Sequence, residues 1–169
     1  MSDNVYLGNP NLKKANTPIE FTQDQILEFM RCKEDPVYFA NNYIKIVSLD
    51  EGLTQFHPYD FQTKLINNFH EHRFNICKMP RQTGKSTTVV SYLLHYAVFN
   101  DSVNIGILAN KAATARELLN RLQTAYENLP KWMQQGVLVW NRGSLELENG
   151  SKILAASTSA SAVRGMSFN

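Results

Sequence analysis

The chain has 169 residues, of which 43% are hydrophobic and 19% charged, a composition typical of one globular domain with a core. Seventeen basic and fifteen acidic side chains give a formal net charge of +2, which is too small to indicate nucleic-acid binding and does not exclude a local basic groove. Cys32 and Cys77 have no CxxC or histidine partner, so neither a disulfide framework nor a zinc site is predicted. We expect a soluble protein of a reducing cytoplasm, without a signal segment or membrane span.

The first part of the chain predicts an arm followed by helices. Residues 1–20 are polar and interrupted by glycine and proline, so we expect a disordered N-terminal arm. Residues 21–72 are predicted to form a helical lead-in, with Thr22 as the N-cap of its first helix and Asp35 before the proline that starts the second. A third, amphipathic helix is expected over 59–72, where apolar residues recur at helical spacing.

The remaining residues, 73–169, predict alternating strands and helices. Apolar runs at 73–79 and 103–109 are expected to be buried strands, each followed by a helix. Three short strands follow, "GVLVW", "SLELE" and "SKILAAS", and Asn149-Gly150 predicts a tight hairpin turn between the last two. This order predicts an α/β fold built on a parallel sheet, which the hairpin would extend.

The stretch "KMPRQTGKSTT", residues 78–88, lies between a predicted strand and a predicted helix. A phosphate-binding loop needs inward backbone N–H groups at a helix N-terminus, a cation for the β- and γ-phosphates and a hydroxyl for Mg²⁺. Gly84 permits close approach of the backbone, Lys85 supplies the cation and Ser86 supplies the hydroxyl. The stretch therefore predicts a nucleotide site of the P-loop NTPase class.

One position departs from the general pattern of such loops. Met79 stands where the first glycine is usual, so a chance Gly-Lys-Ser at a helix start is the alternative interpretation. The strand–loop–helix context favours the nucleotide site, because the groups that meet phosphate are the last three residues. Arg81 lies four residues before Lys85, and its guanidinium either stabilises the γ-phosphate or is a solvated, phosphate-steadying side chain.

The run Arg81-Gln82-Thr83-Gly84-Lys85-Ser86 resembles the deviant phosphate loop, R-Q-x-G-K-[ST], of the large terminase subunit, the ATPase motor that packages DNA in tailed bacteriophages. The likeness covers roughly residues 35–169 and implies an ASCE/RecA-like P-loop ATPase core over 73–169. It implies ATP and Mg²⁺ as cofactors, with Ser86 as the magnesium ligand. The residues implied to bind the nucleotide are Phe61, Gln62, Arg81, Gln82, Thr83, Gly84, Lys85, Ser86 and Thr87.

Two further stretches carry the resemblance. "YDFQTKLI" is similar to the family's adenine-recognition motif, which implies that Gln62 reads the adenine edge with Phe61 or Tyr59 nearby. Val163-Arg164-Gly165 resembles an arginine-glycine motif that in some terminases supplies a finger to the ATP of a neighbouring subunit. The resemblance thus implies catalytic roles for Arg81, Lys85 and Arg164, with Arg164 acting either in cis or in trans.

The family pattern also calls for an apolar strand ending in Asp-Glu after "RGMSF", where the aspartate helps to hold Mg²⁺ and the glutamate polarises water. This sequence ends at Asn169 before such a strand, so we expect an incomplete core, from a truncated chain, a split gene product or an incomplete reading frame. We expect residues 1–169 alone to bind nucleotide weakly and to hydrolyse almost none.

The resemblance implies that the intact protein is an ATP-driven motor that moves viral DNA into a procapsid in the host-cell cytoplasm. Its implied partners are double-stranded DNA, the portal protein and the small terminase subunit, with a separate C-terminal chain if the gene is split. The intact motor would be a homo-oligomeric ring with no membrane partner. The alternatives are a helicase- or recombinase-type P-loop ATPase and a non-catalytic binding or complementation fragment.

Overall fold

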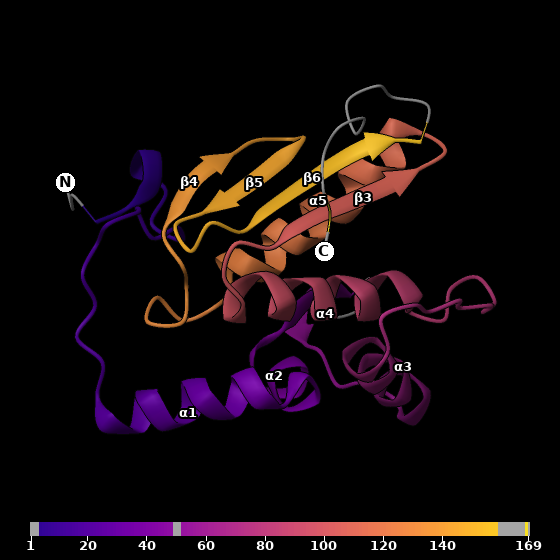
Figure 1. The fold of residues 1–169 in the computed structure, drawn as a ribbon, viewed down its shortest axis with the longest axis horizontal. Coiled ribbons are helices and arrows are strands. Elements are labelled where there is room, and N and C mark those ends of the chain that lie inside the picture. The colour runs from indigo at the N-terminus through magenta and orange to yellow at the C-terminus, as the bar shows by residue number, and fades with distance from the viewer. Residues whose placement is uncertain (1–3, 49–51, 159–167, 169) are drawn as a thin grey trace.

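The computed structural model describes residues 4–48, 52–158 and 168, which form helices beside a four-stranded sheet (Figure 1). The helices are η1 (Tyr6–Gly8), α1 (Gln23–Glu34), α2 (Pro36–Tyr43), α3 (Asp60–Glu71), α4 (Lys85–Phe99) and α5 (Ala112–Glu127). The strands are β1 (Lys45–Ser48), β2 (Gly52–Gln55), β3 (Asn104–Ala109), β4 (Val137–Trp140), β5 (Ser144–Leu147) and β6 (Lys152–Ser157). Within the described ranges no helix is both long and apolar enough to cross a membrane.

The main sheet is mixed, with the strand order β3-β6-β5-β4. β3 and β6 run parallel, whereas β5 is antiparallel to both β6 and β4. The turn between β5 and β6 contains Asn149 and Gly150, and Gly150 has the positive φ of 82° that such a tight turn requires. The predicted hairpin is therefore confirmed, and it makes the sheet mixed because a short turn can join only antiparallel neighbours. β1 and β2 form a separate antiparallel pair.

The helices lie in layers beside this sheet (Figure 1). α5 packs on β3 and β6, α4 packs on α5, and α2 and α3 contact α4 from the other side. α4 is apolar on more than one side because it is enclosed between two layers. Its Leu94 and the Leu119 and Leu122 of α5 are fully buried, as is Ile153 of β6. This packing fixes the start of α4 against the lead-in helices.

The predicted helix starts of the lead-in are confirmed. Thr22 accepts a hydrogen bond from the backbone N–H of Gln25, and the Gln25 side chain accepts one from the N–H of Thr22. Asp35 accepts from the N–H groups of Val37 and Tyr38 at the start of α2. The third predicted helix is α3, whose buried face holds Leu65 and Ile66. These starts could be predicted because each cap is a contact within four residues of the chain.

The strand predicted at 73–79 is wrong. These residues belong to no strand, and Phe74 and Ile76 are 83% and 101% exposed. A buried strand needs a hydrogen-bonded neighbour, and no described strand pairs with this segment. The sheet begins at β3 instead, and the segment runs as an irregular connection from α3 to the loop before α4 (Figure 1). Its apolar composition alone gave no information about pairing.

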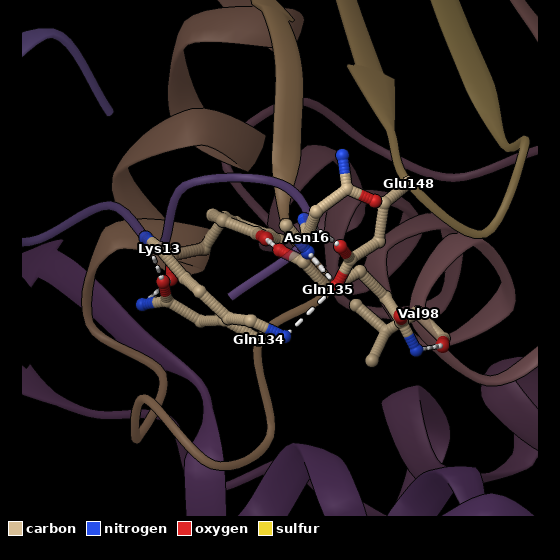
Figure 2. A network of polar contacts seen from close by, with 8 residues as sticks. Lys13, Asn16, Val98, Gln134, Gln135 and Glu148 are labelled. Carbon is tan, nitrogen blue, oxygen red and sulfur yellow. Dashed lines mark hydrogen bonds and ion pairs between the residues drawn. The ribbon is translucent and has the colours of Figure 1, made fainter. Parts of the chain in front are cut away.

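Of the N-terminal arm, expected to be disordered, residues 4–16 pack against the β4 side of the sheet before the chain runs to α1 (Figure 1). Leu12 is 1% exposed, and the carbonyl of Lys13 accepts a hydrogen bond from the N–H of Val137 at 2.9 Å. Figure 2 shows Lys13, Gln134 and Glu148 around this segment, where Lys13 Nζ lies 2.8 Å from Glu148 Oε1. The polar composition of the arm does not reveal these contacts, because their partners lie far along the chain.

Candidate phosphate-binding site

The loop at residues 80–84 leads directly into α4 at one end of that helix (Figure 1). Gly84 is the N-cap of α4 and has a φ of 72°, and Gln82 also has a positive φ, of 62°. α4 has no side-chain cap and no acidic residue in its first turn. Neither the N-cap nor the first turn of α4 thus provides an anion for its first N–H groups and the positive end of its helix dipole, an arrangement that favours a bound anion.

Lys85 is the first residue of α4 and is half-buried. Its Nζ donates a hydrogen bond to the carbonyl oxygen of Met79 at 3.3 Å. Met79 thus contributes through its backbone, and a backbone carbonyl is available from any residue type. The hydroxyl of Thr83 donates to the carbonyl of Pro80 at 3.1 Å, which closes the loop on itself. The absence of the early glycine is compatible with this path of the chain.

Gln62, on the first turn of α3, reaches the loop from the other side and is only 3% exposed. Its Oε1 accepts a hydrogen bond from the N–H of Tyr59 at 2.9 Å, and its Nε2 donates to the carbonyl of Thr83 at 3.4 Å. A Cβ at Gly84 would lie 2.4 Å from Gln62 Nε2. Gln62 and the loop before α4 are therefore in direct contact.

The other predicted site residues differ in exposure. Ser86 and Thr87 lie half-buried in the first turn of α4, with Ser86 next to Lys85, whereas Arg81 and Gln82 are exposed. Phe61 is 44% exposed and stacks on Tyr59, with ring centroids 5.9 Å apart. Arg164 lies outside the described residues. The structure thus brings Gln62, Thr83, Gly84 and Lys85 together and leaves the Phe61–Tyr59 pair at the surface.

Two features of the site, the buried Thr88 and a neighbouring cavity, were not predicted from the sequence motif. Thr88 is completely buried, and its hydroxyl donates to the carbonyl of Gly84 at 3.1 Å, which fixes that carbonyl. The only hint in the sequence is the run of hydroxyl residues after Lys85. A cavity of about 530 Å³ also reaches Thr87, between β1 and the middle of α5, where Asn120 and Arg121 line it. This cavity depends on tertiary packing, so no local pattern could predict it.

A magnesium ion fits this site only together with a phosphate ligand. In the part of the chain that the structure describes, no group of three or more His, Cys, Asp or Glu side chains could hold a metal ion. Mg²⁺ commonly binds through one or two protein oxygens, substrate phosphates and waters. The hydroxyl of Ser86 beside Lys85 is a protein oxygen of that kind.

Comparison with known proteins agrees with the fold. Residues 76–169, more than half of the chain, match the family described as terminase large subunit, T4likevirus-type, N-terminal. The crystal structure of the HK97 bacteriophage large terminase is similar, with a TM-score of 0.64 and 19% sequence identity over 80% of this chain and 29% of that chain. At this identity the likeness shows the fold alone, and the chain spans less than a third of that protein. From the family match, this chain belongs to the T4likevirus-type large terminase subunits and corresponds to their N-terminal part.

Proposed function

We propose that this chain is the nucleotide-binding, N-terminal part of a DNA-packaging motor, and that residues 80–87 bind ATP with Mg²⁺. The observation that carries the proposal is the left-handed Gly84 before an uncapped 15-residue helix whose first residue is Lys85. The N–H groups of the first turn, the helix dipole and an ammonium group then lie at one place, which suits a triphosphate. The family match favours this function over a helicase or recombinase.

Each loop residue has a distinct part in the proposed site. When nucleotide binds, Lys85 Nζ would donate to phosphate oxygens in place of the carbonyl of Met79. The first N–H groups of α4 would donate to the same phosphates. Ser86 contributes its hydroxyl to Mg²⁺, which neutralises phosphate charge when bound. The exposed guanidinium of Arg81 is free to reach the γ-phosphate, and we propose Arg164 as a second cation for the same charge, in cis or in trans.

Binding of Mg·ATP and of inorganic tripolyphosphate to the purified 169-residue chain tests this site by calorimetry. Lys85→Ala should weaken both by roughly 10- to 100-fold, the range expected for a hydrogen bond to a charged group. Lys78→Ala is the matched control, because it removes the same charge from an exposed position in the same segment. Equal affinities for Lys85→Ala and the unchanged protein would contradict the proposal.

The activity of the intact motor is proposed from the family. Hydrolysis would drive double-stranded DNA into a procapsid through sequence-independent phosphate contacts, in a homo-oligomeric ring with the portal protein and the small terminase subunit in the host cytoplasm. Since phosphoryl transfer depends on positioned charges, a chain without the Asp-Glu strand should hydrolyse ATP extremely slowly. Rapid Mg²⁺-dependent turnover by residues 1–169, abolished by Lys85→Ala, would show that view to be mistaken.

A second candidate is a complementation fragment that acts with a separate chain. Among the described strands β3 lies at an edge of the sheet, beside β6, and Phe74 and Ile76 of the connection between α3 and α4 are exposed. A strand at the edge of a sheet can pair with an added strand. Mixing with a chain that carries the acidic strand separates the cases: ATPase activity only in the mixture supports a split motor, and none in any mixture supports a plain binding role.

A further inference from the structure

We infer that the turn between β5 and β6 is a C-terminal cap for α4, and that the cap, rather than the turn itself, needs the amide of Asn149. The inference concerns the end of α4 opposite to the proposed nucleotide site and does not depend on that site. It comes from side-chain donors that reach the last carbonyls of α4 from residues far along the chain.

The last carbonyls of α4 need partners from outside the helix. The final four C=O groups of an α-helix have no intrahelical donor, and in α4 they belong to residues 96–99. Ala97, Val98 and Phe99 are at most 5% exposed, so water has little access to this end of the helix, and its last turn contains no basic residue. Because an unpaired buried carbonyl is costly, donors from other parts of the fold stabilise this end.

Side chains from the region of the hairpin supply these donors. Asn149 Nδ2 donates to the carbonyl of Ala97 at 2.9 Å and to that of Asn100, the C-cap residue, at 3.0 Å. Gln135 Nε2 donates to the carbonyl of Val98 at 3.1 Å, and Figure 2 shows the two residues side by side. The end of α4 is thus closed by one residue that precedes β4 and by one that joins β5 to β6.

The surroundings of Asn149 fix the orientation of its amide. Its Oδ1 accepts from the N–H of Ser151 at 3.1 Å, so Nδ2 is the atom that faces the helix. Ser151 is completely buried, and its hydroxyl donates to the carbonyl of Asn100 at 2.9 Å. The carbonyl of Asn149 accepts from the N–H of Ser102 at 2.9 Å, just after α4. The turn and the end of α4 therefore form one hydrogen-bonded unit, which holds α4 at the end away from its uncapped N-terminus.

The turn itself does not depend on the amide donor. It is closed by the N–H of Gly150, which donates to the carbonyl of Leu147 at 3.0 Å, and its positive φ of 82° is at Gly150. Aspartate and glycine are both common before a glycine in hairpin turns. A carboxylate at position 149 would keep the bond from the N–H of Ser151, but it would present an oxygen without a proton to two carbonyls at the negative end of a helix dipole. Substitution can thus separate the cap from the turn.

Urea unfolding at pH 7 compares Asn149→Gly and Asn149→Asp with the unchanged 169-residue chain. Asn149→Gly should raise the equilibrium constant of unfolding by roughly 5- to 50-fold, the effect of leaving a buried carbonyl without its donor. Asn149→Asp should raise it further, because its charge faces the C-terminus of the helix. Asn141→Asp is the matched control in the turn between β4 and β5. Asn141 Nδ2 donates to the hydroxyl of Ser144 at 2.9 Å, which can rotate and donate in return, so this change should be about twofold or less.

Amide hydrogen exchange in the peptide covering residues 96–103 locates the effect. Both variants at position 149 should speed exchange there by roughly fivefold or more, and by a larger factor than in residues 4–16. An effect of the new charge on Glu148 alone would appear first in residues 4–16, because Lys13 and Asn16 bond to that carboxylate. If Asn149→Asp does not fold, Asn149→Gly still gives both readings. Unfolding as in the control, or exchange that rises less at 96–103 than in residues 4–16, would overturn the inference.

Discussion

Replacing Glu148 with glutamine is expected to release the N-terminal arm from the sheet. Glu148 accepts hydrogen bonds from Lys13 Nζ at 2.8 Å, from the N–H of Asn16 at 2.8 Å and from the N–H of Gly136 at 2.6 Å. Its side chain is 23% exposed and that of Lys13 only 10%, so the ion pair is screened weakly. Removing one partner of a fully buried pair costs roughly 3–5 kcal/mol. For this partly exposed pair we expect a loss of about 2 kcal/mol in the free energy of unfolding.

Urea unfolding followed by tryptophan fluorescence would measure this loss, since the chain contains two tryptophans. Glu146→Gln is the matched control, because Glu146 pairs with Lys152 at 3.2 Å with side chains 32% and 57% exposed. Surface pairs of this kind contribute roughly 0–1 kcal/mol. A loss for Glu148→Gln no larger than that of the control, with unchanged amide exchange in residues 4–16, would refute the reasoning.

The same carboxylate predicts a pH dependence. Burial raises the pKa of Glu148, but the hydrogen bonds from Lys13, Asn16 and Gly136 outweigh it and hold the pKa below its ordinary value of 4.5. A lowered folded-state pKa means that the stabilisation is present above pH 4.5 and is lost as the pH falls through the folded value. The difference in stability between the unchanged chain and Glu148→Gln should therefore shrink below pH 4.5, and a constant difference would contradict this assignment.

Three other changes test the core, the loop and the arm. Burial lowers the pKa of His95 from 6.5 to about 4. As the pH falls from 6.5 to 4, His95 therefore binds a proton in the unfolded chain but not in the folded one, and the free energy of unfolding should fall by about 3 kcal/mol. His95→Met should reduce this pH dependence in urea unfolding, and an unchanged pH dependence would contradict the assignment. Gly84→Ala, at a φ of 72° and with a Cβ that would lie 2.4 Å from Gln62 Nε2, should cost about 1–2 kcal/mol and speed loop exchange. Gly143→Ala is the control, because its Cβ would meet only Asn141 Oδ1, at an ordinary contact distance of 3.6 Å. Leu12→Ala should cost about 2–5 kcal/mol in urea unfolding, and a loss under about 1 kcal/mol would mean that the arm is not packed.

Features that depend on neighbours along the chain were predictable from the amino-acid sequence. Thr22 and Asp35 cap helices through backbone groups two or three residues away, and Asn149-Gly150 forms its turn within a few residues. The composition of the loop before α4 is local in the same sense, because Gly84 and Lys85 lie at the start of the helix that follows them. Such contacts involve only residues close together in the chain, so the helix caps and the turn could be predicted from the residue types alone.

Tertiary structure alone decided the features whose partners are distant. The polar arm is held by Lys13 and Glu148, which are 135 residues apart, and Gln62 contacts the carbonyl of Thr83, 21 residues further along the chain. The apolar run at 73–79 is not a strand because strand formation needs a partner, which no composition can supply. An amide or a carboxylate has the same appearance in a sequence whether it meets water or a buried backbone group, and only the folded chain brings that group to it.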